Sequence, residues 1–162
     1  MKLYVASSWR NQYQPQVVNI ARRFDFDVYD FRQPEPGNDG FRWSEVATPG
    51  TDWKQWTLDE YRAALQHPVA QHGFALDMQA LINADACLLV MPCGRSAHLE
   101  LGYAVGAHKP TAVLYPEAVS FEPELMVKMT SGGVLVGYTE LRTWLQMVAR
   151  HISAIDKFQT KR

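Results

Sequence analysis

The sequence has neither an excess of one charge nor a long apolar run. Its 16 Lys and Arg residues nearly balance its 17 Asp and Glu residues, and the net charge of −1 gives no overall attraction to nucleic acid or acidic membranes. No apolar stretch approaches the roughly 18 to 20 residues that a membrane-spanning helix needs. We therefore expect neither a nucleic acid polymer nor a membrane as a partner.

Cysteine is scarce and histidine is scattered. The two cysteines, Cys87 and Cys93, lack the Cys-x-x-Cys spacing of a structural zinc site, and the five histidines form no ligand cluster. We therefore expect no metal ion and no cofactor. The N-terminus lacks the charged-then-apolar pattern of a secretory signal, which leads us to expect a cytoplasmic protein.

The remaining composition is that of a packed globular protein. Hydrophobic residues make up 47% of the 162 positions, which is ample for one core, so we expect a single domain spanning residues 1–162. Strand patterns alternate with helix patterns, and this alternation predicts an α/β three-layer sandwich with a mainly parallel sheet. The predicted strands are 2–6, 26–30, 86–91, 111–115 and 133–136, and the predicted helices are 17–24, 57–67, 69–84, one from about 96, and 139–155.

Residues 31–56 contain too many Pro and Gly residues for a regular element. A loop of this length in a compact domain is typically a functional lid or disordered, and its aromatic residues argue against disorder. Two interpretations stay open: these rings stack on a planar ligand, or they form a small satellite core. The rings belong to Phe31, Phe41, Trp43, Trp53 and Trp56.

Glu100 follows a buried-looking strand and a short loop. The apolar run 86–91 ends at Pro92, and a helix is expected to begin near Ser96, with Glu100 in its first turn or just beyond. Ligands of open α/β sheets bind at the carboxyl ends of the strands, where helix N-termini favour negative charge. Glu100 is thus either an ionised catalytic carboxylate, such as a nucleophile, or an acid that only complements the helix dipole.

A second loop is expected at the same edge of the sheet, after the first strand. It offers the hydroxyl of Ser8 and the guanidinium of Arg10, and the loop before Glu100 offers the backbone N–H groups of Gly94, Arg95 and Ser96. Together these groups can hold a phosphate or another anion. Taken singly, Ser8 also fits a helix cap and Arg10 a solvated surface charge.

Asp77 stands between apolar residues in the predicted helix 69–84. Its carboxylate either faces water or points toward the active edge from a neighbouring helix. In the second case it can handle the proton that glycoside-type chemistry has to move.

The candidate site residues, taken in order along the chain, resemble the motifs of a known protein family. The ordered series Tyr4-x-x-x-Ser8-x-Arg10, then Asp77, then Glu100-Leu101-Gly102-Tyr103-Ala104 resembles the nucleoside 2-deoxyribosyltransferase superfamily, which includes nucleoside 5'-monophosphate N-glycosidases. The resemblance spans roughly residues 2–115. It implies a flavodoxin-like or Rossmann-like fold and an enzyme that cleaves or transfers the N-glycosidic bond of a nucleoside or nucleotide.

The resemblance also implies roles for single residues. Glu100 matches the family's nucleophile, Asp77 matches an aspartate near the leaving base, and Ser8 and Arg10 match the phosphate contacts of the monophosphate glycosidases. Tyr4 is carried over as a substrate contact. Family members commonly form oligomers, so a homo-oligomer is expected. The loop 93–100 departs from the family's Ser-x-Gly-x-Gly-Tyr-Glu and Asp-x-Gly-Thr patterns, and this leaves base, sugar and acceptor open.

Two further functions stay open at the level of sequence. One is a non-catalytic nucleotide-binding or signalling module. The other is an NAD-cleaving domain of the TIR-like kind, which also uses a glutamate on a comparable helix.

Overall fold

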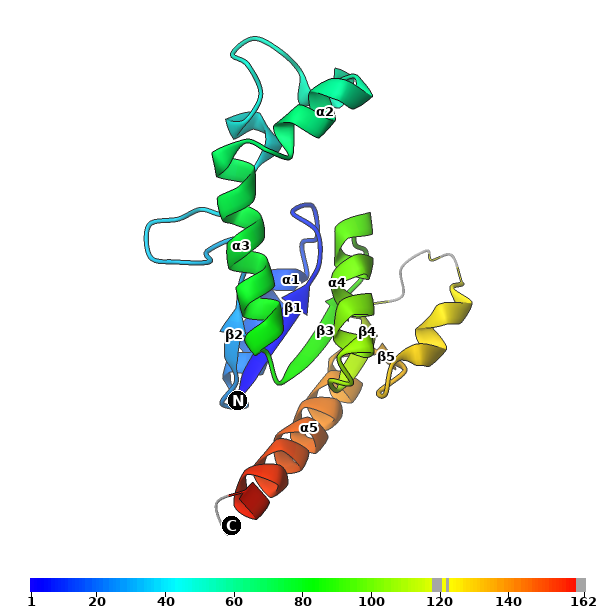
Figure 1. Ribbon diagram of the computed structural model, residues 1–162. Helices are drawn as coiled ribbons and strands as arrows, with labels where there is room; N and C mark the ends of the chain where they lie inside the picture. Colours follow the sequence, from blue (N-terminus) through cyan, green and yellow to red (C-terminus); the bar gives the residue numbers. More distant parts are fainter. Residues whose placement is uncertain (118–120, 122, 160–162) are drawn as a thin grey trace. The chain divides into compact units, whose positions relative to one another are not determined.

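The computed structural model describes residues 1–117, 121 and 123–159. The chain divides into two compact units, one formed by Met1–Tyr29 with Asn83–Arg162 and the other by Asp30–Ile82. The first unit carries a parallel five-stranded sheet in the order β2-β1-β3-β4-β5, as Figure 1 shows in part. Its strands are β1 (Lys2–Ala6), β2 (Asp27–Tyr29), β3 (Ala86–Val90), β4 (Thr111–Tyr115) and β5 (Val134–Val136). The predicted α/β fold is confirmed, and this strand order is the flavodoxin-like one.

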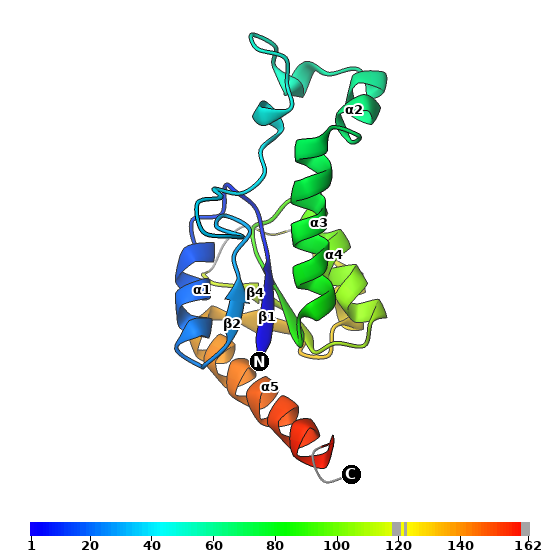
Figure 2. The ribbon, with the colours of Figure 1, turned by 60° about the vertical axis from the view of Figure 1, so that its left-hand side comes forward.

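Helices cover both faces of the sheet in the first unit. Figure 2 shows α1 (Gln14–Arg22) on one side of the strands and α4 (Arg95–Gly106) on the other. The long helix α5 (Gly137–Gln159) shares the α1 face, because its residues Leu141, Trp144 and Leu145 join the core cluster of α1 and the strands. The β3 strand is buried along its whole length, as a central strand with two covered faces requires.

The boundaries of several helices differ from those predicted, and α2 (Leu58–Ala64) ends three residues before its predicted end. Helix α1 begins at Gln14 rather than after Pro15, and it ends at Arg22. Proline is accommodated in the first turn, because the N–H that it lacks has no partner inside the helix there. Helix α5 begins at Gly137, two residues before the predicted start, and extends to Gln159.

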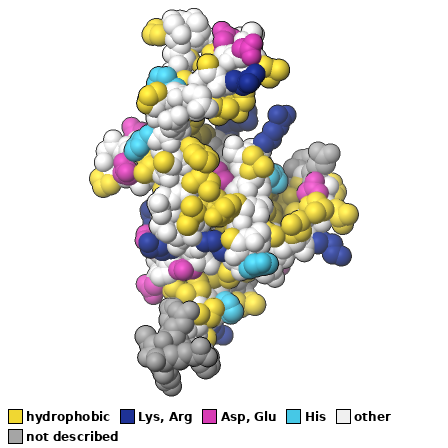
Figure 3. Space-filling view, viewed as in Figure 1, with side chains coloured by type: hydrophobic (Ala, Val, Ile, Leu, Met, Phe, Trp, Pro, Cys, Tyr) yellow, Lys and Arg dark blue, Asp and Glu magenta, His cyan; other side chains and the backbone are white. Residues whose placement is uncertain are grey.

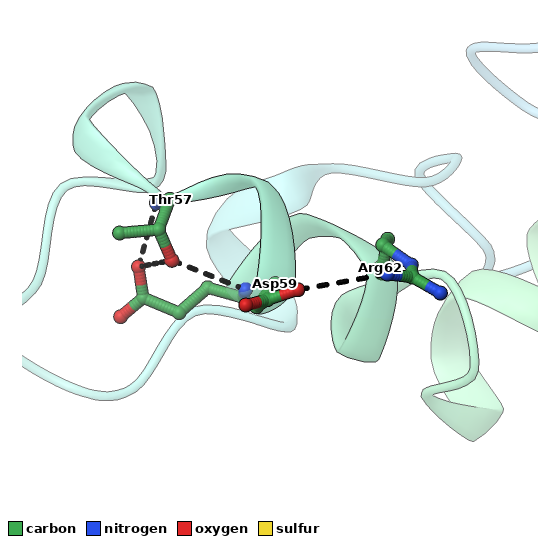
Figure 4. A network of polar contacts seen from close by, with 4 residues as sticks. Thr57, Asp59 and Arg62 are labelled. Carbon is green, nitrogen blue, oxygen red and sulfur yellow. Dashed lines mark hydrogen bonds and ion pairs between the residues drawn. The ribbon is translucent and has the colours of Figure 1, made fainter.

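The second unit starts with an irregular segment and then has two short 3-10 turns, η1 (Trp43–Glu45) and η2 (Trp53–Gln55). The helices α2 (Leu58–Ala64) and most of α3 (Pro68–Asn83) follow. Thr57 and Glu60 form the capping box that the sequence predicts for α2, as Figure 4 shows. The Glu60 carboxylate accepts from the Thr57 N–H at 2.7 Å, and the Thr57 hydroxyl accepts from the Glu60 N–H at 3.3 Å. These hydrogen bonds fix the start of α2.

The aromatic residues of the 31–56 loop contact one another within the second unit. The Trp43 ring meets those of Phe41 and Trp56 edge-on, with centroids 4.8 and 5.7 Å apart, and it also contacts Tyr61 of α2. This arrangement favours a small satellite core for these rings. Trp53 remains outside the cluster and is 38% exposed.

A third 3-10 turn, η3 (Leu125–Met129), precedes β5 in the first unit and carries exposed apolar side chains. Hydrophobic side chains are accordingly visible at its position in Figure 3. On the face drawn there, side chains of both charges are interspersed, in keeping with the balanced composition. None of the helices in the described part of the chain is both long and apolar enough to cross a membrane.

Gly132 is a position where a side chain does not fit. A Cβ there would meet the Trp144 indole, with Cδ1 at 2.8 Å, and the Ala112 Cβ at 3.0 Å. Because Trp144 is packed in the core, we expect Gly132→Ala to lower the free energy of unfolding by about 1–3 kcal/mol. Urea denaturation measures this loss.

Gly102 provides the matched control for this substitution. It lies in the interior of α4, and a Cβ there meets no atom within 4 Å. Gly102→Ala should therefore raise stability by about 0.5–1 kcal/mol, because alanine favours the helix. Equal effects of the two substitutions would show that packing at Gly132 is loose.

Candidate functional site

The candidate site lies where β1 and β3 end side by side. These two strands are neighbours in the sheet, with Ala6 paired to Leu89. The helices that follow them, α1 and α4, cover opposite faces. The chain thus leaves the sheet in opposite directions at this point, which is the topological switch point where open α/β sheets bind ligands.

Asn11 ties the two loops of the switch point together, a role that the sequence alone did not predict. Its side-chain amide donates to the carbonyls of Val90 and Pro92, both at 3.0 Å, and its side-chain oxygen accepts from the N–H groups of Tyr13 and Gln14. The residue is 1% exposed. The signal in the sequence was an Asn in the turn before a helix, where its side chain commonly caps backbone groups.

Ser7 and Ser8 also order the first loop, by different contacts. The Ser7 hydroxyl donates to the Val90 carbonyl at 3.0 Å and so adds a second link between the loops. The Ser8 hydroxyl accepts from the Arg10 N–H at 3.2 Å. Helix α1 starts several residues later with Tyr13 as its N-cap, so Ser8 does not cap it. The alternative interpretation of Ser8 as a helix cap is wrong.

The predicted anion-binding residues are at the surface of this edge. Arg10, Arg95 and Ser96 are exposed, and Ser8 and Gly94 are half-buried. Gly94 is the N-cap residue of α4, and no side chain forms a capping hydrogen bond there. A Cβ at Gly94 would meet no atom within 4 Å. The first turn of α4 contains no acidic residue, so its backbone N–H groups face no protein carboxylate of that turn.

Glu100 is the sixth residue of α4, in its second turn. The helix dipole acts mainly in the first turn, so the expected support of the ionised carboxylate by the dipole is weaker than the sequence suggested. Burial raises the pKa values of Cys87 in β3 and of Cys93 in the loop before α4, and the negative charge of Glu100 raises both further. Glu100 therefore lies close to both thiols, on the side of the sheet that α4 covers.

Tyr4 shares that side of the sheet. Its neighbours Leu3 and Val5 belong to the core cluster with α1 and α5, and side chains alternate along a strand, which turns Tyr4 to the α4 side. Tyr4 pairs with Cys87 in the sheet and its ring stacks on that of Tyr29, with centroids 5.5 Å apart. The ring is 1% exposed.

Cys93 is not an activated thiol. Burial, reinforced by the charge of Glu100, raises its pKa to about 11. A thiol with this pKa is protonated at neutral pH, and the thiolate is the nucleophilic form. Glu100 therefore remains the candidate nucleophile of this edge.

Asp77 belongs to the second unit. It lies in α3 and is half-buried. Its pairing with Glu100 stays a prediction of the resemblance. The second unit also has an open cavity of about 350 Å³ whose lining includes Trp56, Glu60 and His67, and this cavity contains none of the predicted site residues.

Comparison with known proteins supports the fold. No family model matches the sequence, and no curated protein matches it. Among solved structures, a 2-deoxyribosyltransferase from the psychrotolerant bacterium Bacillus psychrosaccharolyticus matches with a TM-score of 0.50 and 16% identity, over 88% of this chain and 90% of that chain. A conserved protein from Enterococcus faecalis V583 matches with a TM-score of 0.40 and 13% identity, over 91% and 87%. At these identities the first likeness supports the shared α/β fold, and the second adds nothing to it.

Proposed function

We propose that this protein cleaves or transfers the N-glycosidic bond of a nucleoside or nucleotide, with Glu100 as the nucleophile. The observation that carries the proposal is the place of Glu100, in the second turn of the helix α4, which starts at the β1/β3 switch point. The fold shared with a protein described as a 2-deoxyribosyltransferase supports nucleoside chemistry in particular.

In this proposal, the Glu100 carboxylate attacks the anomeric carbon while the bond to the base breaks. The bonding electrons leave with the base, and Asp77 supplies or positions the proton that the base takes up. Water, or a second base, then attacks the same carbon and frees the carboxylate. Tyr4, on the same side of the sheet, is the proposed contact for the bound substrate.

Exposed and half-buried groups of the two loops form the proposed anion site. Arg10 and Arg95 supply guanidinium groups, Ser8 and Ser96 supply hydroxyls, and Gly94 leads into the uncapped N-terminus of α4. Charged hydrogen bonds of this kind suit the phosphate of a nucleoside 5'-monophosphate. The Asn11 bridge keeps the two loops at a fixed separation for that contact.

Arg10→Ala and Arg95→Ala test the phosphate assignment. Each should weaken the binding of a nucleoside 5'-monophosphate by about 1.5–3 kcal/mol, the range for hydrogen bonds to charged groups, and should leave the binding of the bare nucleoside almost unchanged. Calorimetry with both ligands measures the difference. Arg142→Ala, an exposed arginine of α5, is the control. Equal losses for the two ligands would refute the phosphate contact.

The function itself is tested by chromatography of free base. The wild-type protein is incubated separately with nucleosides, nucleoside 5'-monophosphates and NAD. Release of a purine or pyrimidine base from the first two supports the proposal. Nicotinamide release from NAD alone would favour the TIR-like alternative, and binding without any turnover would favour a nucleotide-binding module.

We also propose a homo-oligomer, as the family resemblance implies. On α4, Leu99 is 77% exposed and Tyr103 is 41% exposed. Apolar side chains so exposed are available for contact with a second copy of the chain.

A further inference from the structure

Three side chains with metal-binding atoms gather in the loop between β3 and α4. The Cys93 Sγ lies 3.4 Å from the Met91 Sδ and 3.5 Å from the His98 Nδ1. Met91 and Cys93 are half-buried and His98 is exposed, so the cluster is reached from solvent. The proposed reaction uses none of these three groups.

We propose that Met91, Cys93 and His98 form a binding site for one Cu(I) ion. The donor set is a thiolate, a thioether and an imidazole, and soft sulfur donors of this kind select Cu(I). This copper site uses none of the residues Glu100, Arg10 and Arg95 to which the proposed function gives roles. It does not depend on the proposed function.

The distances between the donors suit one shared ion. At angles between tetrahedral and trigonal, metal–sulfur bonds of about 2.3 Å place two sulfurs about 3.8–4.0 Å apart. A sulfur and a nitrogen bound at about 2.3 and 2.0 Å lie about 3.5–3.7 Å apart. The 3.5 Å between the Cys93 Sγ and the His98 Nδ1 fits this geometry, and the 3.4 Å between the two sulfurs is shorter than it, so the Met91 and Cys93 side chains have to move slightly apart. The three side chains therefore need only small adjustments to meet at one ion.

The donor atoms of Met91, Cys93 and His98 argue against a zinc site. Structural zinc sites use four ligands from Cys, His and acidic residues, and a thioether is not one of them. In the described part of the chain, no three His, Cys, Asp or Glu residues stand close enough to hold an ion. Glu100, whose charge acts on Cys93, adds a favourable negative charge near the cluster without being needed as a ligand.

Copper binding removes the proton of the Cys93 thiol and fixes the position of the ring proton of His98. The Cys93 thiol gives up its proton to solvent as the copper–sulfur bond forms. The His98 Nδ1, which now lies 3.2 Å from the Gly94 carbonyl, must present its lone pair to copper, so the neutral ring carries its proton on Nε2. The copper enters and stays as Cu(I), and no electron is exchanged.

The test is a competition for Cu(I) with bicinchoninate, whose copper complex is coloured, under reducing and oxygen-free conditions. The wild-type chain should withdraw one equivalent of Cu(I). Cys93→Ser, Met91→Leu and His98→Asn should each weaken binding by at least about tenfold, since even outer partners of metal ligands cost 10- to 100-fold. Cys93→Ser should have the largest effect, because it removes the thiolate.

Matched controls separate this site from other soft donors. His72→Asn and Met126→Leu remove a histidine and an exposed methionine elsewhere and should leave the affinity unchanged. The other thiol, Cys87, is fully buried and cannot bind copper in the folded protein. Circular dichroism checks that each variant is folded.

Copper retention by folded Cys93→Ser at the wild-type affinity would overturn the proposal. So would a wild-type chain that fails to compete with bicinchoninate. X-ray absorption of the copper-loaded wild type should show sulfur and nitrogen neighbours, and a copper site with nitrogen and oxygen neighbours alone would also contradict it. None of these measurements involves a nucleoside, so their outcome is independent of the enzymatic proposal.

Discussion

Glu100→Gln is expected to abolish the release of base from any nucleoside or nucleotide that the wild type cleaves. The amide keeps the shape of the side chain but is a far weaker nucleophile than a carboxylate, so no glycosyl intermediate forms. Ligand binding and the free energy of unfolding should stay close to those of the wild type. Chromatography of free base under single-turnover conditions measures the loss, and calorimetry with the same ligand measures the binding.

Glu140→Gln is the matched control for this substitution. Glu140 lies in the first turn of α5, where its carboxylate accepts from the Val136 N–H at 2.7 Å. Its replacement should leave turnover unchanged. A Glu100→Gln variant that keeps most of the wild-type turnover would remove Glu100 from the catalytic role.

Asn11→Ala is expected to lower the free energy of unfolding by about 2–4 kcal/mol, because it removes hydrogen bonds from several backbone groups at once. The Val90 carbonyl keeps the Ser7 hydroxyl as a partner, whereas the Pro92 carbonyl and the Tyr13 N–H lose the contacts that Asn11 makes. Urea denaturation measures the loss. The variant should also bind nucleotide more weakly, since the two loops of the switch point lose their link.

Asn19→Ala is the control, because Asn19 is an exposed residue of α1. It should change stability by no more than about 0.5 kcal/mol. If Asn11→Ala unfolds at the same urea concentration as Asn19→Ala, the bridge between the loops contributes nothing to stability.

The central part of the sheet could be predicted from the sequence because its strands are buried on both faces. The runs at 2–6 and 111–115 are apolar after their first residue, and the structure has β1 and β4 over the same residues. The capping box of Thr57 and Glu60 could also be predicted, because the two residues lie within one turn of helix. Such patterns involve residues that are close in the sequence, so they can be recognised without knowledge of the fold. The organisation of residues 1–162 as a single domain stays a prediction beside the two compact units of the structure.

The boundaries of α1 and the contacts of the switch point could not be predicted in the same way. Pro15 suggests a break, although a proline in the first turn of a helix is compatible with it. Asn11 lies 79 residues from Val90 in the chain, and only the sheet order brings the two together. The same holds for the nearness of Glu100 to Cys87, which depends on how α4 packs on β3.

The cluster of Met91, Cys93 and His98 escapes sequence-based prediction for a different reason. Metal sites are recognised in a sequence by Cys-x-x-Cys spacing or by grouped histidines, and the pattern Met-x-Cys-x-x-x-x-His belongs to neither. The cluster forms because the histidine of the first α4 turns lies back over the loop that precedes the helix. The roles of Glu100, Asp77, Tyr4, Ser8, Arg10, Gly94, Arg95 and Ser96 remain predictions.

The anomeric configuration of the product is the most direct test of a glutamate nucleophile at the N-glycosidic bond. The reaction of a nucleoside substrate in aqueous methanol is followed by NMR, because a methyl glycoside keeps the configuration with which it forms. A covalent intermediate on Glu100 requires two displacements, so we predict a methyl β-glycoside from a β-nucleoside, with retention. A methyl α-glycoside as the initial product would show a single displacement and would contradict the account.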